Sequence, residues 1–325
     1  MAKAAHRLPP DTTRQRQGPT LAQRDARLAY LLLALPVLLI LLLVVFPLLW
    51  NILLSLREIR LIELRDLNLF RGDFTLSNYD KVIGTRDFWP LLRTTFIYAF
   101  FGTALPILMG LAAALLARDV FIGRPFVRAV MLIPYISPVV AVSFVWGIML
   151  NAQYGIVNHW LSELGFARIA FLGQRSATFD ILGLEVRWPV ALTAVILFQG
   201  WRYFPFSFLF FLARLQSIPE ELYEAAKVDG ATLTQRFRFI TMPELRFVMG
   251  TLILLRFIWT FNKFEDVFLL TGGAAGTRIL TVQIYEWLFG RSDVGAAAAL
   301  SIVLALILAV MLFIYFRWFF KDEVA

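Results

Sequence analysis

Long apolar runs alternate with short charged stretches along the whole chain. A helix needs about 20 apolar residues to cross a bilayer, and several of the runs reach that length. Four of them contain no charged residue: 28–56, 94–117, 129–150 and 294–316. Two others, 188–213 and 247–270, are as long but include charged side chains. The pattern therefore predicts an all-α polytopic membrane protein with six transmembrane helices.

Composition narrows the class further. Of the 325 residues, 59% are hydrophobic and 17% are charged, and the mean hydropathy of +0.72 excludes a water-soluble globular protein. The chain has no cysteine and two histidines, which argues against disulfides, thiolate chemistry and histidine metal clusters. The first apolar run is longer than that of a signal peptide, so we expect it to remain in the mature protein.

The distribution of charge predicts the orientation, because Lys and Arg collect on the cytoplasmic flanks of transmembrane helices. With the N-terminus inside, the inside segments hold 16 Lys and Arg against 10 Asp and Glu. The outside segments hold 12 against 11. Both termini are therefore expected in the cytoplasm.

The segments between and beside the apolar runs give the domain organisation. Residues 1–27 are polar and basic and are predicted to form a disordered cytoplasmic arm. Residues 28–320 are predicted to form the transmembrane domain, and residues 321–325 a short cytoplasmic tail. The outside loops 57–93 and 159–187 are too small to be independent domains.

One inside segment, residues 214–246, is too polar for the bilayer but carries signals for ordered helices. Ser217 and Glu220 have the spacing of a capping box, which favours a helix start. Gly230 is expected to end this helix, and Pro243 is expected to break the chain before the fifth transmembrane helix. The prediction is a helix, a glycine turn and a second helix at the cytoplasmic surface.

The same segment carries a spaced motif. It reads Glu-Ala-Ala at 224–226, then Gly230, Ile240 and, after Met242, Pro243. This pattern resembles the EAA loop of bacterial ABC importer permeases, with methionine in place of the usual leucine. Residues 261–273 are also similar to the carbohydrate-uptake branch, the binding-protein-dependent permeases of the maltose transporter type.

The resemblance implies that residues 217–243 form a cytosolic coupling loop that binds a separate ATPase. In that role Gly230→Asp or Glu224→Lys is expected to uncouple transport without preventing insertion. The coupling residues implied by the motif are Glu224, Ala225, Ala226, Asp229, Gly230, Ile240 and Pro243.

The resemblance also implies an assembly in the bacterial cytoplasmic (inner) membrane. Its partners would be a second homologous permease, two ATPase subunits and an extracytoplasmic solute-binding protein, with no role for nucleic acid. This chain contains no Gly-Lys dipeptide and therefore no Walker A loop. We thus expect no cofactor here, and ATP and Mg²⁺ on the partner ATPase.

Polar stripes mark the two charged transmembrane helices. Ionisable groups inside a membrane usually face a cavity, and helical spacing places the polar residues of each helix on one face. Aromatic rings beside amide and charged donors suit a sugar, and the resemblance places a sugar pocket on the same faces. The predicted substrate-binding residues are Gln199, Arg202, Tyr203, Phe206, Arg256, Thr260, Asn262 and Lys263.

Alternatives stay open for the solute and for some of the charges. The Arg and Lys in the stripes leave room for an acidic sugar or a glycerophosphodiester, and an amino acid or another small solute is a further alternative. For Arg202, pairing with Glu265 or Asp266 and lining a water-filled vestibule are both open.

An intramembrane enzyme is the remote alternative function. It requires paired carboxylates, a metal-ligand cluster or a nucleophile with a base. Glu265 and Asp266 are adjacent in sequence and point about 100° apart on a helix, so they do not form a carboxylate pair. We therefore predict a non-catalytic transport subunit.

Overall fold

The structure is a computed structural model that describes residues 21–66, 74–181 and 184–319. The chain divides into two units, residues 1–53 and 54–325. The described part of the first unit is one long helix: α1 (Leu21–Ile40), a π-helical turn (Leu41–Val45) and α2 (Phe46–Ser55), whose last residues belong to the second unit. Helix α1 includes residues 21–27, which the sequence assigned to the arm. The rest of the arm and the predicted tail lie outside the described residues.

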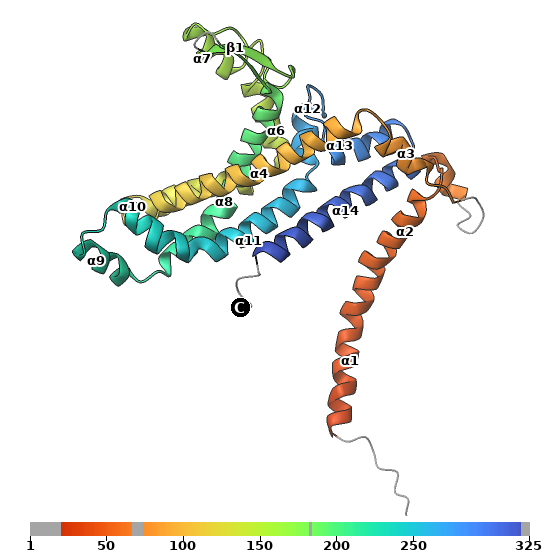
Figure 1. The fold of residues 1–325 in the computed structure, drawn as a ribbon, viewed down its shortest axis with the longest axis horizontal. Coiled ribbons are helices and arrows are strands. Elements are labelled where there is room, and N and C mark those ends of the chain that lie inside the picture. Colours follow the sequence, from red (N-terminus) through yellow and green to blue (C-terminus); the bar gives the residue numbers. More distant parts are fainter. Residues whose placement is uncertain (1–20, 67–73, 182–183, 320–325) are drawn as a thin grey trace, which may run out of the picture. The chain divides into compact units, whose positions relative to one another are not determined.

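The second unit is mainly helical, with long helices in its centre (Figure 1). Its first elements are the 3₁₀ turn Leu61–Asp66, α3 (Ser77–Ile83), α4 (Phe88–Leu116), α5 (Arg124–Ile136), α6 (Val139–Met149), α7 (Ile156–Glu163), β1 (Ala177–Ile181) and β2 (Leu184–Trp188). Its later elements are α8 (Val190–Gln216), α9 (Glu220–Val228), α10 (Leu233–Arg236), the π-helical turn Phe237–Thr241, α11 (Met242–Phe261), α12 (Glu265–Thr271), α13 (Leu280–Tyr285), the π-helical turn Glu286–Gly290 and α14 (Val294–Phe319).

Helices α4 and α8 form the centre of this unit, and small residues let their backbones approach closely. A Cβ atom added at Gly110 would lie 2.5 Å from the Cβ of Ser207 and 2.7 Å from the amide nitrogen of Phe208. Glycine at this position therefore sets the distance between the helices, as small residues do in membrane helix pairs. A buried apolar cluster that includes Phe208, Phe211 and Leu245 continues the packing toward α11.

Four helices of the described chain are long and apolar enough to cross a membrane: residues 28–55, 88–116, 190–216 and 294–317. The bent pair α5 and α6 is a fifth candidate. These helices agree with a polytopic membrane protein of mainly helical fold. The predicted six-helix topology and its orientation stay predictions.

The third predicted transmembrane helix, residues 129–150, is divided into two helices in the structure. Helices α5 and α6 meet at an angle of 95° across Ser137 and Pro138. Ser137 is extended, with φ −63° and ψ 140°. A residue that precedes proline is driven out of the helical region by the proline ring. The apolar character of the run hid this Ser-Pro break.

Two further boundaries differ from the prediction. The fifth transmembrane helix was predicted to end at 270, but α11 ends at Phe261 and a separate helix, α12, follows from Glu265. The predicted outside loop 159–187 contains an antiparallel hairpin, in which Ala177 pairs with Trp188. The fold class is therefore not purely α-helical. Strands of five residues within a loop are too short for their alternation of apolar and polar residues to stand out in the sequence.

Candidate functional site

A polar cavity of about 110 Å³ lies between α5, α8 and α11. Its lining combines three aromatic rings, one amide and two cationic groups. The lining residues are Tyr135, Gln199, Tyr203, Arg256, Trp259 and Lys263. Four of them come from the predicted substrate-binding set, so the two polar stripes do face one another across this cavity.

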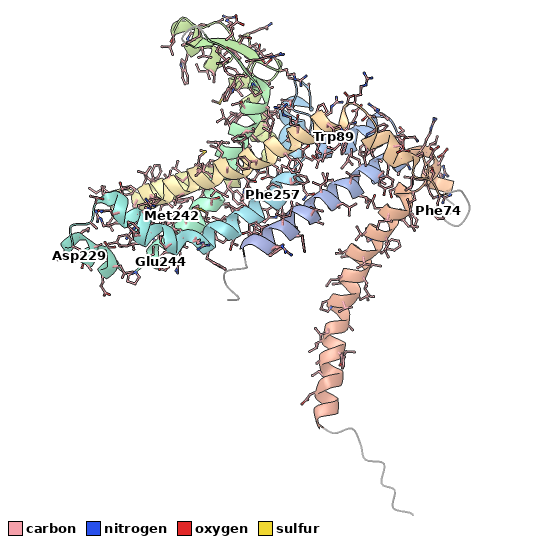
Figure 2. The ribbon with its side chains drawn as sticks, viewed as in Figure 1. Phe74, Trp89, Asp229, Met242, Glu244 and Phe257 are labelled. Atoms are coloured by element: carbon pink, nitrogen blue, oxygen red, sulfur yellow. The ribbon has the colours of Figure 1, made fainter. Side chains whose placement is uncertain are left out.

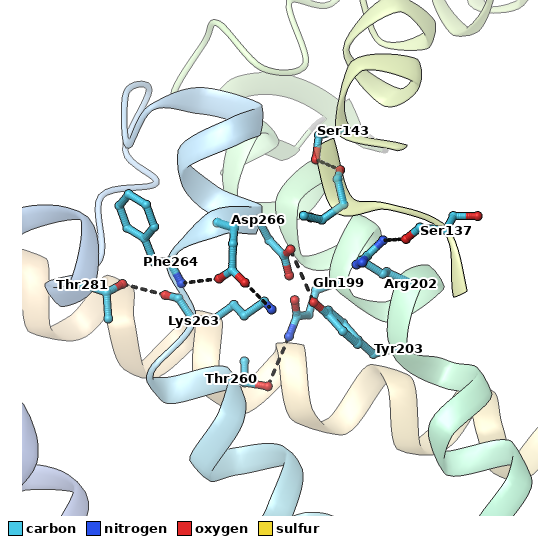
Figure 3. A network of polar contacts seen from close by, with 12 residues as sticks. Ser137, Ser143, Gln199, Arg202, Tyr203, Thr260, Lys263, Phe264, Asp266 and Thr281 are labelled. Atoms are coloured by element: carbon cyan, nitrogen blue, oxygen red, sulfur yellow. Dashed lines mark hydrogen bonds and ion pairs between the residues drawn. The ribbon is translucent and has the colours of Figure 1, made fainter. Parts of the chain in front are cut away.

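Gln199 is the centre of the buried network beside the cavity (Figure 3). Its side chain is 1% exposed and hydrogen-bonds with Thr260 at 3.2 Å. In the amide orientation that satisfies both ends, its nitrogen donates to Asp266 and Tyr98, and its oxygen accepts from Arg256 at 3.1 Å. The amide thus connects a buried carboxylate to a buried guanidinium.

The ring of Tyr203 lies beside two cations. The Arg256 Cζ lies 4.4 Å from the ring centroid and the Lys263 Nζ lies 5.0 Å from it, both within cation–π range. The Tyr203 hydroxyl donates to Asp266 Oδ1 at 3.5 Å. Lys263 also pairs with Glu265 at 3.3 Å. The cavity wall is therefore cationic and aromatic, with the acidic groups set behind it.

The structure places the other predicted substrate residues at different distances from the cavity. Thr260 is fully buried against Gln199, and Phe206 packs with Tyr135 and Trp259, with ring centroids 6.0 and 5.2 Å away. Asn262 is exposed and its side chain donates to the Ile258 carbonyl of its own helix. The structure therefore brings Thr260 and Phe206 behind the lining but does not bring Asn262 to it.

For Arg202, the structure shows a contact that neither sequence alternative included. Its Nη1 donates to the backbone carbonyl of Ser137 at 3.0 Å. That carbonyl lies at the bend between α5 and α6, where the helical hydrogen-bond pattern is interrupted. Arg202 thus joins α8 to the bend, a role that depends on a break the sequence analysis did not predict.

Sequence reasoning missed three residues of this region: Tyr98, Tyr135 and Trp259. Trp259 follows Arg256 by three positions and precedes Lys263 by four, so the helical spacing of the stripe could have found it. Tyr135 lies two residues before Ser137 on the bent segment, and no periodic signal marks it. No group of three His, Cys, Asp or Glu side chains among the described residues comes together as a metal site.

The predicted helix, glycine turn and second helix are present at the far end of α8. Helix α9 ends in a turn with Gly230 in the left-handed region at φ +77°. The Ala231 amide donates to the Ala226 carbonyl at 2.8 Å, and the Gly230 amide donates to Lys227 at 3.0 Å. These two bonds are a Schellman motif, in which glycine takes the left-handed position without steric cost.

Two details of this segment were wrong in the sequence analysis. The expected capping box at Ser217 and Glu220 is not formed, because the Ser217 hydroxyl instead donates to the Arg214 carbonyl at 2.8 Å and Pro219 precedes the helix. A capping box occurs one helix later, between Thr232 and Gln235.

Pro243 does not break the chain as expected. The helical path runs without interruption from Leu233 to Phe261. A π-helical turn at Phe237–Thr241 ends two residues before the proline. Such a turn shifts the hydrogen-bond register, and Pro243 lies at the start of α11, directly after this shift.

Helix α9 is fixed on one side and free on the other. On its inner side Tyr223 is buried, its hydroxyl hydrogen-bonds with Thr241 at 2.9 Å, and the guanidinium of Arg118 lies 4.0 Å from its ring centroid. Arg118 also pairs with Glu220 at 3.1 Å. On the outer side Glu224 is exposed, and so are the motif residues Ala225, Asp229 and Gly230.

Tyr223 offers a test of this attachment. We expect Tyr223→Phe to lower the free energy of unfolding by about 1 kcal/mol, the usual worth of one buried hydrogen bond, and to leave uptake intact. Tyr223→Ala also removes the contact with Arg118, so we expect α9 to detach and uptake to fall at least tenfold. Thermal unfolding and uptake by both variants check the prediction. Equal uptake by the two variants would show that Tyr223 does not hold α9.

Comparison with known proteins shows which family this chain belongs to. The family described as "Binding-protein-dependent transport system inner membrane component" matches residues 102–319. The chain belongs to this family. It is therefore an ABC transporter permease of the inner membrane, a transport component rather than an enzyme.

Two relatives illustrate the similarity of the permease to other permease chains. It is 37% identical over 284 residues to the inner membrane ABC transporter permease protein YcjO of Escherichia coli (strain K12), which covers 87% of this chain and 91% of that protein. It is 30% identical over 299 residues to the trehalose/maltose transport system permease protein MalF of Thermococcus litoralis, which covers 91% and 95%.

A solved structure shares the fold of the permease. A chain of a bacterial ABC transporter involved in the import of the acidic polysaccharide alginate matches with a TM-score of 0.74 at 21% identity. The match covers 91% of this chain and 96% of that one. The likeness shows that the described helices follow the fold of an ABC importer permease.

Proposed function

We propose that this chain is the transmembrane subunit of an ATP-driven importer for a sugar or a sugar-like solute. It forms half of the translocation pathway and works with a second permease, two ATPase subunits and an extracytoplasmic binding protein. The chain crosses the membrane six times, with α11 as the fifth crossing and both termini in the cytoplasm. Residues 28–320 make up this permease domain, and residues 1–27 and 321–325 flank it.

The cavity beside Gln199 carries the proposal for the solute. Tyr135, Tyr203 and Trp259 offer flat apolar surfaces on which a sugar ring can stack. Gln199, Arg256 and Lys263 offer hydrogen-bond donors to hydroxyl groups. Relatives whose names include trehalose, maltose and galactooligosaccharide transport support the same class of solute.

Coupling to the ATPase is assigned to α9 and the turn that follows. The motif residues Glu224, Ala225 and Asp229 face away from the membrane helices, and large apolar side chains accompany them. Val228 is 87% exposed and Leu233 is 77% exposed. Exposed apolar groups beside charged ones are typical of a surface that a partner protein covers. Tyr223 fixes α9 to Arg118, just after α4, and to Thr241, just before α11, so a movement of the ATPase would reach both helices.

A solute panel tests the proposal. The chain is purified with its partner subunits, reconstituted in lipid and assayed with its binding protein for ATP hydrolysis and uptake. Trehalose, maltose, galactotriose, glycerophosphocholine and methionine serve as solutes. We expect at least one of the sugars to stimulate both activities at least fivefold. Stimulation by methionine alone, or uptake without ATP, would contradict the proposal.

A further inference from the structure

A second hollow shares no lining residue with the cavity beside Gln199. It consists of two adjoining spaces of about 320 and 780 Å³ that share Arg175 and Gly276. Both spaces lie at the beginning of α4, where Trp89 is found, at the end opposite to Asp229 and α9 (Figure 2). We call this hollow the arginine groove, after the five arginines that line it: Arg93, Arg175, Arg187, Arg278 and Arg291.

The arginine groove has an excess of positive charge that the described residues do not neutralise. Asp87 is the one acidic side chain among its lining residues. None of the five arginines forms an ion pair with a described residue. The polar side-chain contacts that the described chain offers them are neutral: Arg187 donates to Ser176 at 2.8 Å, and Arg278 donates to Gln283 at 3.5 Å. All five arginines are exposed.

The placement of these arginines is specific. Arg175 packs over Gly276, where an added Cβ atom would lie 2.8 Å from its Cγ, so only glycine leaves room for the arginine. The guanidinium of Arg291 lies 4.2 Å from the ring centroid of Trp287. Four segments distant in sequence thus bring their arginines to one groove: the start of α4, the β1–β2 hairpin region, the α12–α13 connection and the turn before α14.

This accumulation runs against the usual charge rule. In the proposed orientation all five arginines lie outside, on the side where positive flanks are disfavoured. Five like charges in one groove repel one another, and the repulsion is relieved when an anion enters. The guanidinium group forms paired hydrogen bonds with a carboxylate, which makes arginine suited to that group in particular.

We propose that the arginine groove binds an oligosaccharide of uronic acid units on its way to the translocation pathway. This inference rests on the proposed function and names its substrate class. Volumes of 320 and 780 Å³ fall in the range of about 300 to 1,000 Å³ typical of small-molecule sites. Trp89 and Trp287 provide stacking surfaces for sugar rings beside the carboxylate-binding arginines.

The spread of the arginines favours a repeating acid over a single anionic group. They line two adjoining spaces rather than converging on one point, as they would for a single phosphate. The cavity beside Gln199 also carries Arg256 and Lys263 with no acidic residue in its lining. Both hollows therefore carry positive charge for the same solute.

Direct binding to the reconstituted complex tests the inference. The complex, without binding protein, is titrated with fluorescently labelled trigalacturonate, and then with its methyl ester, which keeps the shape and removes the charge. We expect the acid to bind at least tenfold more tightly than the ester. Arg175→Gln combined with Arg278→Gln is expected to weaken binding of the acid at least tenfold. Arg175→Lys with Arg278→Lys keeps the charge and is expected to restore part of the affinity.

Arg168→Gln is the matched control. Arg168 is exposed and lies in the same predicted outside loop as Arg175, but it lines neither space of the groove. We expect this variant to bind the acid as the unchanged chain does. If Arg168→Gln weakens binding of the acid as much as the double glutamine variant does, binding depends only on the general surface charge. That result would overturn the inference. Glucose 6-phosphate that competes as well as trigalacturonate would also overturn it, because one phosphate would then suffice.

The remaining outcomes separate this inference from the proposed function. If galactotriose drives ATP hydrolysis and trigalacturonate neither binds nor competes, the groove assignment fails and the sugar importer stands. If the double glutamine variant weakens docking of the empty binding protein, the groove serves an acidic protein surface and the inference is wrong. If no saccharide of either kind stimulates ATP hydrolysis, the proposed function fails and the inference with it.

Discussion

Replacing Gly230 with aspartate is expected to abolish uptake while the chain still folds and inserts. Gly230 has φ +77°, and no atom lies within 4 Å of the position of an added Cβ. The substitution therefore meets no clash inside the chain, and its cost to folding is the backbone strain of about 1 kcal/mol for a left-handed aspartate. The new carboxylate, however, projects from the exposed face of the turn where we place the ATPase.

A second glycine provides the matched control for this variant. Gly123 has φ +85°, and an added Cβ there would also have open space within 4 Å. Gly123 precedes α5 and belongs to another connection that is predicted to lie inside. We expect Gly123→Asp to insert normally and to keep uptake within twofold of the unchanged chain. Both variants bear the same backbone strain and the same added charge. A difference in uptake between them therefore comes from the position of the substitution.

Uptake and ATP hydrolysis measured together distinguish uncoupling from loss of assembly. We expect Gly230→Asp to retain less than a tenth of the uptake, with the chain present in the membrane in normal amount. Copurification of the ATPase shows whether the variant prevents binding of the ATPase or only prevents its movement from reaching the membrane helices. Normal uptake by Gly230→Asp would refute the role assigned to the turn after α9.

Several features of this fold were predictable because they depend on patterns that are local in sequence. The apolar runs at 94–117 and 294–316 appear as α4 and α14, with boundaries that shift by a few residues. The turn at Gly230 was also predictable, since glycine is the residue that takes the left-handed conformation freely. The stripe that joins Arg256 to Lys263 followed from the helical repeat alone.

The features that were missed depend on contacts between distant segments or on small local departures from a helix. The bend at Ser137 and Pro138 lies within an apolar run that was predicted as one helix from its length. The π-helical turn before Pro243 shifts the hydrogen-bond register, and no composition signal reveals it. The arginine groove could not be predicted, because it joins Arg93 to Arg278 across most of the chain.

Removing the guanidinium of Arg256 is expected to have the largest effect on the cavity network. Arg256 is buried, donates to Gln199 and stacks on Tyr203. In Arg256→Met the side chain keeps a similar length, but Asp266 remains buried with one fewer cation nearby. Because a hydrogen bond that involves a charged group contributes about 2 kcal/mol, we expect the free energy of unfolding to fall by that amount. We also expect sugar uptake to fall at least a hundredfold.

A variant at Lys263 separates the stability of the network from the binding of solute. Lys263 lines the same cavity and approaches the same Tyr203 ring, but its side chain is 19% exposed and pairs with the half-exposed Glu265. Exposed pairs contribute little to stability. We therefore expect Lys263→Met to unfold at the same temperature as the unchanged chain and to raise the solute concentration needed for half-maximal uptake.

Neutralising Asp266 completes the test, because it removes the charge that Arg256 compensates. If the cost of Arg256→Met comes from an uncompensated buried carboxylate, then Arg256→Met combined with Asp266→Asn should regain most of the lost thermal stability. Uptake should stay low in the double variant, since the donor that faces the cavity is still missing. The contrary result is a stability loss of the double variant that equals the sum of the losses of the two single variants. That result would mean that Arg256 and Asp266 do not share one network through Gln199.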